Sequence, residues 1–206
     1  TEAAMSPLFT EEDERIDAAI DAAAYNARSH YSHPGFAPVR AEHQHAPVKV
    51  LGRLPPDLRG VYLRNGTNVQ FDQVRTRAHC LNGAGIPHLV QIPDVEATFS
   101  STYIRTPRFE FEQQAGREVF PSYGDMSASG PAGLERMKLL ARKQAQGLVP
   151  PWSGLEANPA STAVQYHHGQ LYCLQGSGLP FVLDHRVEQG RLLLDGNGHL
   201  ESWDGQ

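Results

Sequence analysis

The chain has 206 residues, of which 40% are hydrophobic and 20% charged, and its net charge is -5. A chain of this length and composition can bury a sizeable core, so a folded globular protein is predicted. Nucleic acid is not expected as a partner, because the sequence has no basic stripe to neutralise phosphates. No apolar run approaches the roughly 20 residues of a membrane-spanning helix.

Two cysteines, Cys80 and Cys173, lie far apart and show no zinc-ligand spacing, so neither a disulfide framework nor a structural zinc site is predicted. A reducing compartment is the simpler interpretation. The chain begins with Thr1 and no leader-like segment. Two explanations stay open, removal of a targeting segment and a sequence that is part of a longer one.

The first predicted element is a helix over residues 11–29. Thr10 and Asp13 form a capping box, and Ile16 begins an apolar series at helical spacing that continues largely with alanine. Since alanine buries little area, we expect this helix to pack closely on a neighbour. The following segment, 31–56, contains five prolines and is predicted to be extended and to wrap over other elements.

The rest of the chain is predicted to be mostly β. Short strand-like runs occupy residues 61–63, 89–92, 97–104, 162–166, 170–174, 181–183 and 191–194. Turn signals at 168–169, 176–178 and 195–198 separate several of them, as in an antiparallel meander. A second helix is predicted over 132–148, with an apolar face and basic residues elsewhere. It could lie on a membrane surface, but we favour an ordinary helix packed on the sheet.

A search for catalytic and metal-binding motifs gives little. His43 and His45 share a face if the segment is extended, and could meet a metal together. We favour two solvated histidines, because no third ligand is tied to them. The segment 82–85 lacks the lysine and hydroxyl of a phosphate loop and is interpreted as a tight turn, and 65–66 and 158–159 are also turn signals.

One run is distinctive. Residues 51–68 read LGRLPPDLRGVYLRNGTN, which closely resembles the N-terminal signature of the carotenoid cleavage oxygenases. Segments 35–39 and 47–48, with Glu42, are similar to the lead-in of that family. Segments 103–106, 157–158 and 179–180 follow in the family's order. The helix over 132–148 resembles the plant 9-cis-epoxycarotenoid dioxygenase branch, where a similar segment helps to form an apolar entrance facing the membrane.

The resemblance covers residues 34–206, which leaves 1–33 as an N-terminal helix and lead-in. It implies a mostly β fold with two helices, the N-terminal part of a seven-bladed β-propeller, with 132–148 as a helical insertion. In the family, four histidines from different blades hold a non-haem ferrous iron on the axis. An apolar tunnel brings a carotenoid or apocarotenoid to that iron for cleavage by dioxygen.

The sequence departs from the family at three points. The family's four iron-binding histidines lie beyond Gln206, so no metal ligand or catalytic residue is assigned here. A family motif with two carboxylates falls on 79–86, where Asn82 and Ala84 replace them. The family's glutamate that holds an iron-ligating histidine corresponds to Gly176. Losing such a partner typically lowers metal affinity or activity by about 10 to 100-fold.

We therefore favour a non-catalytic relative, a structural or pigment-contacting subunit of a larger plastid assembly at a photosynthetic membrane, with no iron in this chain. Its expected partners are other protein subunits, because a partial propeller leaves strand edges and an apolar flank to be covered. A carotenoid or a membrane surface is a further candidate partner. The alternative is the N-terminal part of an iron(II)-dependent carotenoid or apocarotenoid cleavage dioxygenase.

A third hypothesis is an apocarotenoid-binding protein without chemistry. It requires an apolar tunnel lined by residues such as Phe99, Leu139, Leu140 and Phe181. For each of them an ordinary core position is the better expectation, since apolar side chains are inside by default.

Overall fold

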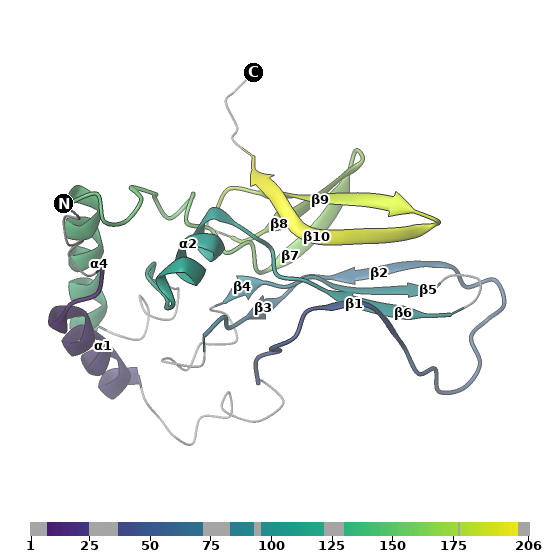
Figure 1. Cartoon of the computed structure of the whole chain (residues 1–206), viewed down its shortest axis with the longest axis horizontal. Coiled ribbons are helices and arrows are strands. Elements are labelled where there is room, and N and C mark those ends of the chain that lie inside the picture. The colour runs from purple at the N-terminus through teal and green to yellow at the C-terminus, as the bar shows by residue number, and fades with distance from the viewer. Residues whose placement is uncertain are drawn as a thin grey trace, which may run out of the picture.

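A computed structural model describes residues 8–24, 37–71, 83–92, 96–121, 130–176 and 178–201 (Figure 1). The helices in this part of the chain are α1 (Glu11–Ala24), α2 (Pro107–Ala115) and α4 (Gly130–Ala145). The strands are β1 (His43–Pro47), β2 (Gly60–Arg64), β3 (Thr67–Asn68), β4 (Ala84–Gly85), β5 (His88–Ile92), β6 (Thr98–Ser101), β7 (Ala163–His167), β8 (Gln170–Leu174), β9 (Phe181–Glu188) and β10 (Arg191–Leu200).

The strands form two four-stranded antiparallel sheets and a short two-stranded one. The first sheet has the order β1-β6-β5-β2, the second has the order β10-β9-β8-β7, and β3 pairs with β4. The two large sheets lie one above the other, with β2 beside β7 (Figure 1). In the described part of the chain, the edge strands are β1 and β2 in the first sheet and β10 and β7 in the second.

The main core lies between the two large sheets. It contains Leu89 of the first sheet and, from the second, Leu171, Cys173, Phe181, Leu183 and Leu194. Gln91 crosses the interface, since its side-chain nitrogen donates to the carbonyl of Leu192 at 2.6 Å and its oxygen accepts from the Leu192 amide at 3.2 Å. Alternate residues of the strands face this core because side chains alternate between the two faces of a strand.

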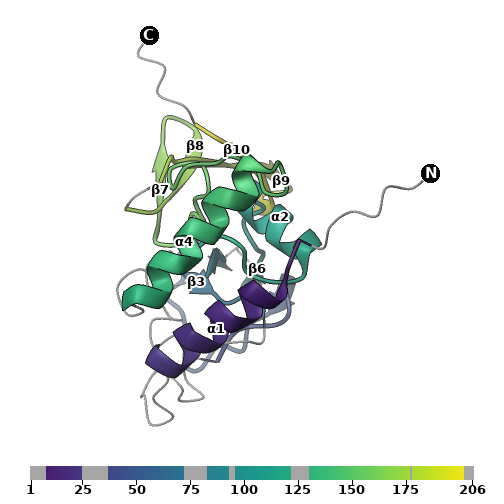
Figure 2. The same cartoon turned by 90° about the vertical axis from the view of Figure 1, so that its left-hand side faces the viewer.

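A second core lies at the helical end of the molecule. It contains Val119, Phe120, Val149 and Ala157, with Phe111, Leu140 and Trp152 packed against it. The rings of Phe120 and Trp152 stack with centroids 5.6 Å apart. At the same end, α1 and α4 lie side by side (Figure 2). None of the helices that the structure describes is long and apolar enough to cross a membrane.

Both predicted helices are confirmed, and a third was missed. The predicted helix 11–29 corresponds to α1, with 25–29 outside the described residues, and 132–148 corresponds to α4. The expectation that α4 packs on the sheet is wrong, because its principal neighbour is α1. The missed helix is α2, which begins after the N-cap Thr106 and ends at the left-handed Gly116. Threonine and glycine are residue types that are favoured at these two positions.

All seven predicted strands are present, with β6 shorter than expected and β9 and β10 longer. The His168-Gly169 turn joins β7 and β8 as predicted. The short strands β3 and β4 were missed, and the wrapping segment contributes β1 to the first sheet. In β1, a register shift between His43 and Ala46 interrupts the pairing with β6.

The predicted turn at 195–198 is wrong, because these residues lie inside β10. The pairing of β10 with β9 shifts register between Leu194 and Gly198. Gly196 has φ 85°, and its carbonyl accepts a hydrogen bond of 2.8 Å from the amide of Arg105. A side chain at Gly196 would overlap the carbonyl of Tyr103, so glycine is needed here for close approach of two backbones rather than for a turn.

Candidate functional site

Of the two positions at which the family motif loses its carboxylates, the structure describes Ala84, which lies between two closely packed glycines. Ala84 is buried in β4, where it pairs with Asn68 of β3. A Cβ at Gly83 would lie 2.6 Å from the carbonyl carbon of Asn68, and one at Gly85 would lie 2.7 Å from the Ile104 side chain. The glycines retained in this motif therefore allow close strand packing. Asn82 and His79 lie outside the described residues.

Gly176, which the family resemblance aligns with a glutamate, lies two residues after the end of β8. It is exposed, and a Cβ built on it would meet no atom within 4 Å. Space is therefore available for a side chain at this position, and packing does not explain the glycine. A carboxylate here would extend from the end of a strand in the second sheet.

Two of the histidines of the first sheet lie against one aromatic ring. His43 and His88 each lie with their ring centroid 5.8 Å from that of Phe99. Burial, with the neighbouring charge of Arg64, lowers the pKa of His88. His45 has φ 51° at the irregularity in β1, so the simple alternation assumed in pairing it with His43 does not hold. No third ligand joins His43 and His45 in a metal-binding group within the described residues.

Two asparagines of the 51–68 run join segments that are distant in the sequence. The amide of Asn65 donates to the carbonyls of Ala160 at 2.7 Å and Ala163 at 3.1 Å, at the entrance to the second sheet. Asn68 accepts from the amide of Val39 at 2.8 Å and donates to its carbonyl at 2.7 Å. Both asparagines are buried. Interpreting 65–66 as a turn missed this bridging role, because the partners of Asn65 lie about a hundred residues further along the chain.

Glu42 has a similar bridging role. One of its carboxylate oxygens accepts from the hydroxyl of Thr102 and the amide of Tyr103, both at 2.6 Å. Its other oxygen pairs with Arg105 at 3.1 Å. Glu42 thus ties the lead-in to the segment that leaves β6.

The residues considered for an apolar tunnel are not brought together. Phe181 belongs to the core between the sheets, Leu139 pairs with Ile16, and Leu140 packs at the helical end. Phe99 is partly buried and packs against the histidine rings of the first sheet. The structure therefore supports the core interpretation for Phe181 and Leu139.

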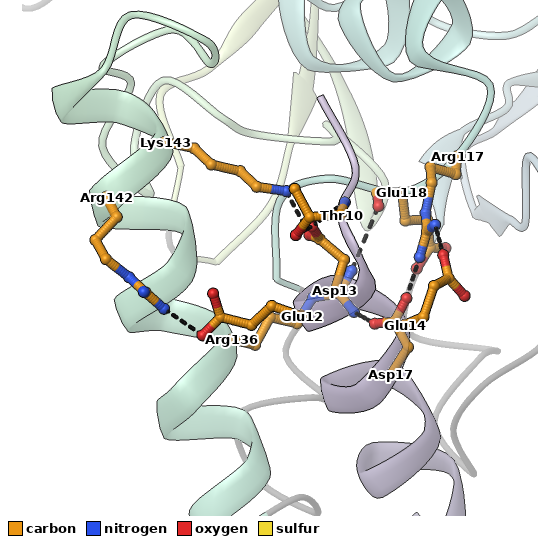
Figure 3. Close-up of polar contacts among 10 residues, drawn as sticks. All are labelled: Thr10, Glu12, Asp13, Glu14, Asp17, Arg117, Glu118, Arg136, Arg142 and Lys143. Carbon is orange, nitrogen blue, oxygen red and sulfur yellow. Dashed lines mark hydrogen bonds and ion pairs between the residues drawn. The ribbon is translucent and has the colours of Figure 1, made fainter. Parts of the chain in front are cut away.

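The densest group of charged side chains lies between α1, α4 and the segment after α2 (Figure 3). Asp17 of α1 pairs with Arg117 and Arg136, and Asp13 pairs with Lys143. Burial raises the pKa of Asp13, but hydrogen bonds from Lys143 and Thr10 outweigh it, so the net shift is downward. Carboxylates and cations are matched in this group, so its described contacts form an ion-pair network between helices.

A family model described as the retinal pigment epithelial membrane protein family matches residues 36–189 of the chain. The chain belongs to this family. Among its curated relatives, a carotenoid 9,10(9',10')-cleavage dioxygenase 1 from Arabidopsis thaliana is 36% identical over 157 residues. The chloroplastic 9-cis-epoxycarotenoid dioxygenase NCED6 from the same plant is 32% identical over 169 residues. These matches cover 75% and 81% of this chain.

Solved structures of carotenoid oxygenases establish the fold. The lignostilbene dioxygenase of Pseudomonas brassicacearum matches with a TM-score of 0.56 and 18% identity over 83% of this chain. The apocarotenoid oxygenase of Synechocystis, in a mutant form, matches with a TM-score of 0.53 and 24% identity over the same share. The predicted fold class is confirmed: the chain forms the N-terminal part of a seven-bladed propeller.

The chain spans less than a third of the length of these relatives. It covers 28% and 27% of the two curated dioxygenases and 31% of each of the two solved structures. Within the described residues, no group of three or more His, Cys, Asp or Glu side chains could hold a metal ion. The described residues therefore do not fit the iron that the family resemblance implies.

Proposed function

We propose that this chain is the N-terminal part of an iron(II)-dependent dioxygenase that cleaves a polyene double bond of a carotenoid or apocarotenoid. The observation that carries the proposal is the 36% identity to a carotenoid cleavage dioxygenase over 157 residues. The iron-binding and reacting residues then lie in the part of the propeller that this chain does not contain. The role of the described residues is to build the first two sheets and the helical end.

The outer face of the first sheet supports this role. Tyr62, Val90 and Phe99 form a cross-strand row on the face opposite the main core, because β2, β5 and β6 pair at these positions. Tyr62 is 62% exposed, and Val90 and Phe99 are only partly buried. In a propeller, each sheet packs face to face with its neighbours, so a further sheet of the same propeller is the proposed cover for this row.

The protein purified from its source organism provides the test. We expect stoichiometric iron and oxygen-dependent loss of the polyene absorption of an added carotenoid or apocarotenoid. The 206-residue chain alone serves as the control, and it should bind no iron. A native protein that contains no iron and cleaves neither the carotenoid nor the apocarotenoid would contradict the proposal.

Two replacements favour a second candidate function. Gly176 leaves open space where the family has a glutamate, and Ala84 lacks a carboxylate as well. We infer from these replacements an alternative, a non-catalytic subunit of a larger assembly, with other protein subunits or a carotenoid as its partners. Some relatives are chloroplastic by name, which supports a plastid location in either case.

The two candidates differ in what the native complex contains. The subunit candidate predicts a stable complex with other polypeptides, without iron and without polyene cleavage. It also predicts that Gly176→Glu, combined with Asn82→Asp and Ala84→Asp in the 206-residue chain, confers no iron binding, because the three added carboxylates cannot replace the missing histidine ligands. Iron in that triple variant, with none in the unchanged chain, would contradict this.

A further inference from the structure

The face of α1 that packs on the rest of the protein is charged. Asp13, Ile16 and Asp17 are its buried residues in the part whose side chains are described. Ile16 contacts Leu139 in an apolar cluster of only these two residues. Ala19, which the sequence pattern placed on the apolar face, is exposed. Among the α1 side chains that the structure describes, residues 11–19, apolar burial is therefore limited to Ile16.

Ion pairs make up most of the described attachment. Asp17 lies between Arg117 and Arg136, and Asp13 pairs with Lys143, all with largely buried side chains (Figure 3). Two more exposed pairs lie at the edge of this network, from Glu12 to Arg142 at 2.7 Å and from Glu14 to Arg117 at 2.5 Å. All the carboxylates come from α1, and all the cations come from α4 or from Arg117.

Phe9, two residues before α1, adds an apolar contact with the core at the helical end and a contact with the cations of the network. The ring of Phe9 lies between two of the same cations, 4.4 Å from the Arg117 guanidinium carbon and 5.0 Å from Lys143 Nζ. Such cation–π contacts are strongest where the cation is shielded from water. The principal helix or strand neighbour of α1 is α4, and the two helices lie at one end of the molecule, away from the main core (Figures 1 and 2).

We propose that α1 is an electrostatically held lid on α4, which opens as a unit while both sheets stay folded. Opening uncovers Leu139 and Val119 together with Arg117, Arg136 and Lys143, which line the same small cavity under α1. The charge of the α1 carboxylates controls the lid. Added salt favours the open form because it screens the exposed pairs of the network more than the buried ones.

Hydrogen exchange followed by mass spectrometry on the full chain tests the lid. Asp17→Asn leaves Arg117 and Arg136 without their shared anion. Breaking a buried pair in this way typically costs about 3 kcal/mol or more, which corresponds to about 100-fold more opening of α1. In the unchanged chain, raising NaCl from about 0.05 M to about 1 M is expected to increase the opening of α1 about threefold or more. Exchange in β8 and β9 should not change in either experiment.

The matched control is Glu188→Gln, which removes the exposed Arg186–Glu188 pair within β9, away from α1 and α4. It should leave α1 exchange unchanged. The lid is refuted if Asp17→Asn has no larger effect than this control, or if α1 and β9 lose protection together by the same factor. Exchange of α1 at the unprotected rate in the unchanged chain at low salt would also refute it.

Discussion

Replacing Asn65 tests whether the 51–68 run acts by joining the two sheets. Asn65→Ala removes two hydrogen bonds, to the carbonyls of Ala160 and Ala163, and a third from the Gly66 amide to the Asn65 side chain at 3.0 Å. Ala160 has no solvent-exposed surface, so its carbonyl cannot turn to water. A typical hydrogen bond contributes about 1 kcal/mol and an unsatisfied buried group costs about 1–3 kcal/mol, so we expect a loss of about 2–4 kcal/mol in unfolding free energy.

Urea denaturation followed by circular dichroism measures this loss. Asn65→Asp keeps the acceptor for Gly66 but loses both donors, so it should be at least as destabilising as Asn65→Ala. Asn197→Ala, at an exposed position of β10, is the control and should change the unfolding free energy by less than about 0.5 kcal/mol. A loss below about 1 kcal/mol for Asn65→Ala would show that these hydrogen bonds do not hold the sheets together.

Three further predictions concern single positions. Burial raises the pKa of the Cys173 thiol to about 12, so this thiol is neither ionised nor accessible at pH 8. In a variant with Cys80 replaced by serine, alkylation of Cys173 should therefore be no faster than unfolding, and rapid labelling of the folded protein would contradict this. Burial lowers the pKa of His88 below its usual 6.5, so the unfolded state binds a proton on this imidazole more readily than the folded state, and the free energy of unfolding falls as the pH drops below about 6.5. His88→Gln should reduce this loss of stability at low pH, and an unchanged dependence of stability on pH would contradict the prediction. Gly178→Ala would place a Cβ 2.5 Å from Asn158 Nδ2 and should lower the melting temperature, whereas Gly176→Ala, with open space around it, should not; equal effects in thermal scans would refute the packing argument.

The second sheet was largely predictable from the sequence. Its strands contain short runs rich in apolar residues, and the turn at His168-Gly169 sets the register of the β7–β8 hairpin. In contrast, α2 was hidden because Phe109 and Phe111 alternate with charged residues, a pattern that also suits a strand. The glycines at 196 and 198 were interpreted as a turn, since nothing local shows that another segment crosses there.

The contacts of the candidate site were less predictable than the strands. The sequence shows an acidic α1 and an alanine series, but the cations that pair with Asp17 lie about a hundred residues away. Helical periodicity therefore assigned the packing face to alanines rather than to Asp13 and Asp17. The family resemblance identified the 51–68 run, yet the bridging role of Asn65 follows only from the position of Ala160.

The most direct test of the proposed function is the intact mass and iron content of the native protein that carries this sequence. The 206 residues account for 22.7 kDa, and relatives of which this chain covers 27–28% are more than twice that size. The dioxygenase account predicts a polypeptide of that larger size with stoichiometric iron. A larger polypeptide that binds no iron, or a native complex of a 22.7 kDa chain without iron, would contradict it.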